Sequence, residues 1–170
     1  NVAENPKTGS LTLEEMAEHD AVIDVKLAAL GNPNIPTRVI HRMAAGTGKR
    51  VRETIAGNIS TPKTILMKSA RDRDTNVAYN VACNPNVPRE ALTILAERRN
   101  IGILVAVVRN KNTPEEALAK LARNNNRNLR LLIAEHENTS RETLEFLLLK
   151  AVKEADQKLA ETVRLALAKQ

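Results

Sequence analysis

The chain has 170 residues and a formal net charge of +6, from 26 Lys and Arg against 20 Asp and Glu. Its single cysteine, Cys83, excludes an internal disulfide, a cysteine-ligated iron–sulfur cluster and a zinc site built from several cysteines. Tyr79 and Phe146 are the only aromatic residues, so the chain is poor in the rings that stack on nucleic-acid bases. We expect one domain spanning residues 1–170, a cytoplasmic setting and a packing role for Cys83.

Residues 1–31 predict an N-terminal cap repeat. Asn5-Pro6-Lys7-Thr8 is a degenerate form of the repeat start described next, and two short apolar patterns of helical spacing follow it. The segment holds two basic and six acidic residues. A charged, solvated outer face suits the end of a repeat array.

A pentapeptide of the type Asn-Pro-Asn-Val-Pro dominates the middle of the chain. Its copies start 26 residues apart, and four repeats run without insertion over residues 32–135. A fixed period of roughly 20–50 residues is typical of solenoids, in which each repeat packs on its neighbours. The sequence therefore predicts an all-α solenoid of about five to six helix–turn–helix repeats. The copies begin at Asn32, Asn58, Asn84, Asn110 and His136.

Each pentapeptide leads into a first helix. Its closing proline suits the first helical turn, where a backbone N–H has no intrahelical partner. Thr113 with Glu116, and Thr139 with Glu142, have the spacing of capping boxes with Thr as N-cap. An apolar residue with a small one four positions later predicts the buried face. These positions are Ile40, Leu66, Leu92 and Leu118, followed by Ala44, Ala70, Ala96 and Ala122.

A polar turn and a second short helix complete each repeat. The apolar pairs again lie four residues apart, which indicates one buried helical face. They are Val51 and Ile55, Val77 and Val81, Ile103 and Val107, and Leu129 and Ile133.

The asparagine that opens each repeat allows two structural interpretations. Stacked side-chain amides could satisfy the backbone of adjacent turns and form a ladder. Alternatively, asparagine could end the preceding helix because it tolerates left-handed backbone geometry. Both interpretations make the column structural.

Residues 136–170 predict a C-terminal cap repeat. The segment keeps the repeat entry at Asn138-Thr139-Ser140 but runs longer than the others. Val163–Ala168 matches Leu129–Ala134 if about eight residues are inserted.

These motifs resemble the leucine-rich repeat variant family, a bacterial-type helical solenoid related in style to HEAT repeats. The Asn-Pro-Asn-x-Pro start, the apolar pair, the polar turn and the second apolar helix carry the resemblance over residues 32–135. The resemblance implies a right-handed superhelix in which an α-helix alternates with a shorter helix that can be 3₁₀. It also implies an interaction surface rather than an enzyme.

No motif in the chain predicts catalysis, a cofactor or a metal site. Gly46-Thr47-Gly48-Lys49 resembles the end of a phosphate-binding loop, but Met43 and Arg50 stand where that motif needs Gly and Ser or Thr. The three histidines fall in different repeats, which argues against a joint site.

The middle repeats carry most of the positive charge. Residues 32–135 hold 18 basic and 8 acidic side chains, and this asymmetry suggests an acidic partner.

The outward face of the second helices is the predicted binding groove. Turning 100° per residue from the buried pairs leads to a column of Glu53, Tyr79, Val105 and Leu131. In α-solenoids the second helix commonly lines the concave surface. The alternative is burial, because residues 101–108 are apolar all round. The predicted groove comprises Lys49, Arg50, Arg52, Tyr79, Ile101, Leu104, Val105, Arg127, Arg130 and Leu131.

The turns between helices form a predicted basic ridge, of Arg71, Arg73, Arg98, Arg99 and Arg123. Charge at turns is also ordinary solvated surface. The sequence thus predicts a non-catalytic scaffold that binds an acidic protein or peptide on its concave surface. The alternative is nucleic-acid binding, with the basic middle repeats contacting the phosphate backbone.

Overall fold

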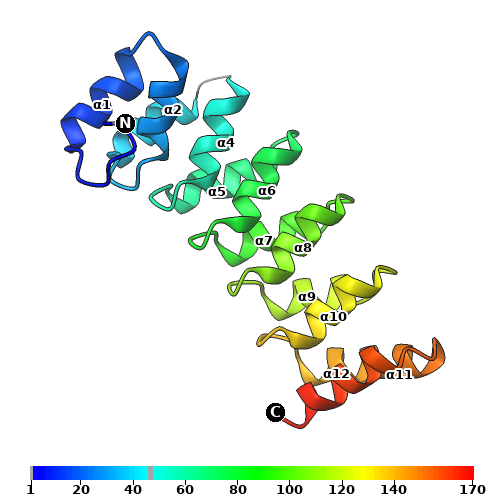
Figure 1. Ribbon diagram of the computed structural model, residues 1–170. Helices are drawn as coiled ribbons and strands as arrows, with labels where there is room; N and C mark the ends of the chain where they lie inside the picture. Colours follow the sequence, from blue (N-terminus) through cyan, green and yellow to red (C-terminus); the bar gives the residue numbers. More distant parts are fainter. Residues whose placement is uncertain (1, 46–47) are drawn as a thin grey trace. The chain divides into compact units, whose positions relative to one another are not determined.

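The protein is all-α, as the repeat pattern predicts. A computed structural model describes residues 2–45 and 48–170, and over these ranges the chain forms twelve α-helices and no strand (Figure 1). None of these helices is long and apolar enough to cross a membrane. The chain divides into two compact units, residues 1–91 and 92–170, and each is described by itself. The single-domain organisation and the handedness of the superhelix stay predictions.

The helices of the first unit form successive pairs, with α7 crossing the boundary between the units. Contacts join α2 to α4 and α4 to α6, so the second helices of neighbouring repeats lie side by side. The helices are α1 (Ser10–His19), α2 (Ile23–Gly31), α3 (Thr37–Ala44), α4 (Lys49–Gly57), α5 (Lys63–Ser69), α6 (Thr75–Cys83) and α7 (Arg89–Leu95).

The second unit continues the same pattern and ends in two longer helices. Here α10 contacts both α8 and α12, and α11 packs on α12. The helices are α8 (Ile101–Arg109), α9 (Glu115–Leu121), α10 (Arg127–Glu135), α11 (Arg141–Lys153) and α12 (Gln157–Leu167).

Both helices of each regular repeat are α-helical. The second helices, α4, α6, α8 and α10, have nine residues each, whereas the first helices have seven or eight. The shorter helix is therefore the first one, and neither is the 3₁₀ helix that the family resemblance allowed.

The buried positions follow the predicted columns. Ile40, Leu66, Leu92 and Leu118 are fully buried on the first helices. The pairs on α6, α8 and α10 are also buried, while Val51 on α4 is half-buried.

The opening asparagines form a hydrogen-bonded ladder between repeats. Nδ2 of Asn84 donates to the carbonyl oxygens of Ala56 and Asn58, both at 2.9 Å. Nδ2 of Asn58 donates in the same way to the carbonyl oxygens of Leu30 and Asn32. Asn32, Asn58 and Asn84 have extended backbone, with φ of −68°, −73° and −70°. The ladder interpretation is confirmed, and the left-handed interpretation is wrong.

His136 takes the asparagine position in the last copy. Its Nε2 lies 3.1 Å from the carbonyl oxygen of Asn110, and its Nδ1 accepts from the N–H of Asn138 at 3.0 Å. Because a carbonyl can only accept, the proton is on Nε2. The imidazole thus bridges two successive repeats, as the amides do.

The predicted capping boxes are wrong in their N-cap residues. The hydroxyls of Thr113 and Thr139 instead donate to the carbonyls of Val107 and Ile133, at the ends of the preceding helices. Pro114 and Ser140 occupy the N-cap positions. Side-chain N-caps are also found at the starts of three second helices, α6, α8 and α10. These residues are Asp74, Asn100 and Asn126.

The C-terminal repeat is lengthened in α11, which has 13 residues. Asp156 caps α12 by accepting from the N–H of Leu159, as Asn126 caps α10 by accepting from that of Leu129. Asp156 lies 30 residues after Asn126, so four residues are inserted rather than about eight. Leu159 and Val163, both fully buried, are the counterparts of Leu129 and Ile133.

Candidate functional site

The apolar residues of the predicted groove differ in exposure. Tyr79 on α6 is 46% exposed and Ile101 on α8 is 44% exposed, whereas Val105 and Leu131 are half-buried. Leu104 is only 4% exposed, which contradicts its expected place on an open surface. The buried interpretation therefore holds for most of α8, where Ile103, Leu104, Ala106, Val107 and Val108 are buried.

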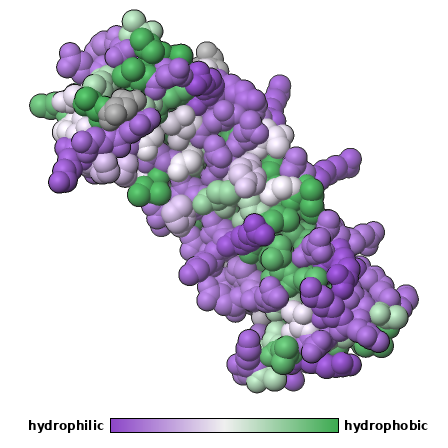
Figure 2. Space-filling model, viewed as in Figure 1, coloured by the Kyte–Doolittle hydropathy of each residue, from purple (hydrophilic) through white to green (hydrophobic). Residues whose placement is uncertain are grey.

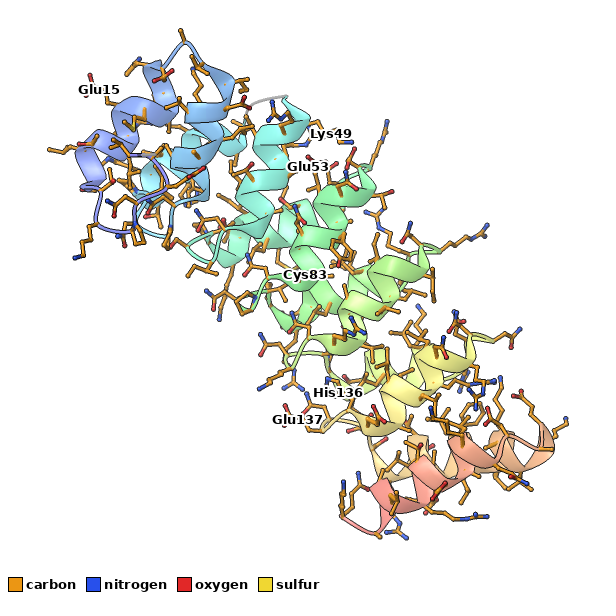
Figure 3. All side chains as sticks on the ribbon, viewed as in Figure 1. Glu15, Lys49, Glu53, Cys83, His136 and Glu137 are labelled. Atoms are coloured by element: carbon orange, nitrogen blue, oxygen red, sulfur yellow. The ribbon has the colours of Figure 1, made fainter. Side chains whose placement is uncertain are left out.

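The basic residues expected at one end of the groove are paired with acids. The guanidinium of Arg52 binds the carboxylate of Asp72, with Nε 2.7 Å from Oδ2. Lys49 Nζ lies 3.1 Å from Asp74 Oδ2 and 3.6 Å from Oε1 of Glu53, its neighbour on α4 (Figure 3). Arg50 reaches back to Asp24 on α2 at 2.7 Å. Each of these cations also joins neighbouring repeats.

The basic residues expected at the other end are paired with the turn between α11 and α12. Arg127 binds Asp156 through two hydrogen bonds, of 2.6 and 2.8 Å. Arg130 binds Glu154 through two, of 3.1 and 2.7 Å. The side chain of Arg130 is only 5% exposed, so it is not the open groove cation that the sequence predicts.

Several of these ion pairs shift the pKa values of their members so that the charged forms are favoured. The hydrogen bond from Arg127 lowers the pKa of Asp156 to about 2, and the N–H of Leu159 adds to the effect. The bond to Asp74 raises the pKa of Lys49, and that to Asp72 raises the pKa of Arg52. Much of the local charge is therefore cancelled by ion pairs within the protein.

The arginines of the basic ridge make fewer contacts within the protein than the cations of the predicted groove. Within the described part of the chain, Arg73, Arg99 and Arg123 make no ion pair, and all three are exposed. Arg71, on the turn after α5, makes one weak hydrogen bond, at 3.4 Å, to the carbonyl of Met67 on that helix. Arg98 is half-buried and has further interactions. The ridge in the first unit therefore offers Arg71 and Arg73.

A pocket of about 610 Å³ lies beside these two arginines in the first unit. It opens between the C-terminal end of α3 and one side of α5, next to α4. Apolar side chains and cationic ones share its wall. The lining comprises His41, Ala44, Ala45, Arg52, Ile55, Thr64, Ile65, Lys68, Ser69, Arg71, Asp72 and Arg73.

The sequence predicts only part of this wall. Arg71 and Arg73 were expected at the ridge and Arg52 in the groove, but Lys68 was not identified. Lys68 is the first-helix residue three positions before Arg71, and helical spacing could have placed the two on one side.

Other candidates do not form a site with these residues. Gly46 and Thr47 of the loop-like motif lie outside the described residues. Cys83 ends α6 and is exposed, so the expected packing role is wrong. In the ranges that the structure describes, no three His, Cys, Asp or Glu side chains are grouped as metal ligands would be.

The ladder, the paired helices and the 26-residue period define a helical repeat protein. Its fold is similar to that of a solved leucine-rich repeat variant with a novel repetitive structural motif, at a TM-score of 0.63 and 24% identity. The match covers 98% of this chain, which spans 62% of the length of that structure.

Computationally designed armadillo repeat proteins for modular peptide recognition are a more distant match. Their TM-score is 0.39 at 15% identity, with 98% of this chain and 89% of the other covered. No protein-family model matches the chain, and no curated protein matches it.

Proposed function

We propose that the chain is a non-catalytic interaction scaffold that binds an acidic protein or peptide partner in the cytoplasm. The observation that supports this proposal is that repeated and unrepeated residues have different roles. The repeated asparagines and core columns are occupied by contacts between repeats. Exposed side chains at matching positions differ from one repeat to the next, as Thr75, Ile101 and Arg127 do. Varied side chains on a regular frame are what a binding surface of a repeat protein needs.

The sequence predicts a binding surface along the second helices. The proposed surface also includes the turns between helices. Most of the surface visible in Figure 2 is hydrophilic, with hydrophobic side chains gathered in patches. Exposed apolar residues such as Tyr79 and Ile101 provide contact area, and the exposed turn arginines provide attraction for carboxylates.

Display selection of random dodecapeptides on the immobilised chain tests this function. We expect enriched peptides to bind the purified protein saturably and to carry more acidic than basic residues. A bare matrix and a repeat protein of similar charge serve as controls. Failure to enrich any peptide above both controls would overturn the proposal.

Nucleic-acid binding is the second candidate, and the unpaired turn cations favour it. Arg73 follows α5 in the first unit, and Arg99 and Arg123 follow α7 and α9 in the second, so each unit offers cations for phosphate contacts. A labelled DNA duplex distinguishes the candidates in an electrophoretic mobility assay. Retardation at physiological salt with a steep salt dependence would support it, whereas no retardation even at low salt would exclude it.

A further inference from the structure

The pocket between α3 and α5 has a surplus of positive charge. Four of its lining residues, Arg52, Lys68, Arg71 and Arg73, are cationic, and Asp72 is the single acid among them. Asp72 is bound by Arg52, whose Nε lies 2.7 Å from Oδ2. The charges of Arg52 and Asp72 therefore cancel. Lys68, Arg71 and Arg73 have no carboxylate partner in the described chain.

The wall between these cations is apolar. Ile55 is 1% and Ile65 8% exposed, and with Ala44 and Ala45 they line the pocket from α4, α5 and the end of α3. The volume of about 610 Å³ is larger than a lone inorganic anion needs, and it lies within the range of sites for small organic groups. The occupant that fits is an apolar body with negative charge beside it.

The turn between α5 and α6 is held in a fixed conformation beside the pocket. Asp72 Oδ1 accepts from the N–H of Asp74, and Asp74 in turn caps α6 through the N–H groups of Asn76 and Val77. Arg71 and Arg73 flank Asp72 on this turn. A fixed backbone reduces the ordering that binding would require of the two arginine side chains.

We propose that this pocket is the docking site for an acidic peptide, and that it receives one aliphatic side chain flanked by carboxylates. The side chain packs against Ala44, Ala45 and the exposed edge of Ile65, while the carboxylates pair with Lys68, Arg71 and Arg73. The proposal rests on the proposed function, because it places the partner of the scaffold at one site. It goes further in naming that site and the two features that a ligand must combine.

Titration of the ¹⁵N-labelled chain with three synthetic peptides tests the docking site. The first is acetyl-Asp-Glu-Leu-Glu-Asp-amide. The second replaces its acids by Asn and Gln, and the third replaces its Leu by Ser. We expect the first peptide to shift the amide signals of Ile65, Lys68, Ser69, Arg71 and Arg73, with about tenfold weaker binding by each of the others.

Two charge-reversed variants separate the pocket from general attraction. Arg71→Glu with Arg73→Glu should weaken binding of the first peptide at least about tenfold. Arg109→Glu with Lys111→Glu changes the net charge equally at exposed residues of the second unit and should leave the affinity within about twofold. Circular dichroism checks that both variants stay helical.

Several outcomes would overturn the docking site. Signal shifts confined to residues away from the pocket, equal binding of the three peptides, or equal weakening in both variants would each do so. None of these outcomes bears on the scaffold function, which fails only if display selection enriches no peptide. The two proposals are therefore tested separately.

Discussion

Asn84 donates a hydrogen bond of 2.9 Å from its side-chain Nδ2 to the main-chain carbonyl of Asn58, the residue at the same position one repeat earlier. The same amide reaches the carbonyl of Ala56, and its Oδ1 accepts from the N–H of Asn86. Asn84 is 1% exposed, so water cannot replace these partners. One side chain thus satisfies three backbone groups in three successive repeats.

Asn84→Asp should lower the free energy of unfolding by about 3 kcal/mol or more, because a carboxylate cannot donate to the two carbonyls that it would face. Urea unfolding followed by circular dichroism measures the loss. Asn125→Asp makes the same change at an exposed turn residue and should cost less than about 0.5 kcal/mol. Equal losses in the two variants would contradict a special role for the ladder.

His136→Asn should stabilise the second unit by about 1 kcal/mol. The imidazole donates only to the carbonyl of Asn110, whereas an amide could also reach that of Val108, as Asn84 reaches that of Ala56. Thermal and urea unfolding would show the gain. His41→Asn, at an exposed position on α3, should change neither midpoint. A lower midpoint for His136→Asn would show that the ring makes contacts an amide cannot replace.

The period and the buried columns could be predicted from the sequence because both depend on residues within one repeat. Leu66 and Val77, for instance, are buried where helical spacing places them. The ion pairs could not be predicted in this way. Arg130 binds Glu154 from 24 residues away, and that contact depends on the length of α11, which has no counterpart in the regular repeats.

The prediction that Thr113 and Thr139 are N-caps is wrong for a related physical reason. Thr113 followed by Glu116 satisfies the local rule for a capping box, but the preceding helix ends nearby, where the carbonyl of Val107 accepts from the N–H of Asn110 and can accept a second hydrogen bond. The hydroxyl donates to that buried carbonyl, and Pro114 begins the next helix instead. Local spacing alone does not show which of two neighbouring helix ends a side chain will satisfy.

Ala155→Gly should stabilise the chain by about 1 kcal/mol. Ala155 has a φ of 54°, in the left-handed region, where it ends α11 with hydrogen bonds from Ala155 to Val152 and from Asp156 to Ala151. Glycine adopts this geometry without the penalty of a Cβ. Differential scanning calorimetry should show a higher midpoint, whereas Ala168→Gly, at a φ of −71°, should give none. An unchanged midpoint for Ala155→Gly would contradict the assigned strain.

Acid should destabilise the chain partly through Asp156. Its pKa is lowered to about 2, first by the hydrogen bond from Arg127. A carboxyl with a lowered folded-state pKa contributes stability that is complete above about pH 4 and is lost as the pH falls toward 2. Asp156→Asn should therefore lower the urea midpoint at pH 7 and reduce its fall between pH 4 and 2.5. Glu161→Gln, an exposed α12 change, should do neither.

The central claim is that repeated residues hold the fold while unrepeated ones at the turns bind the partner. The most direct test is the dissociation constant of a display-selected acidic peptide for the variant with Arg71→Glu and Arg73→Glu. We predict at least about tenfold weaker binding with an unchanged urea midpoint. Unchanged affinity would contradict the claim, because the peptide would then bind without the two arginines.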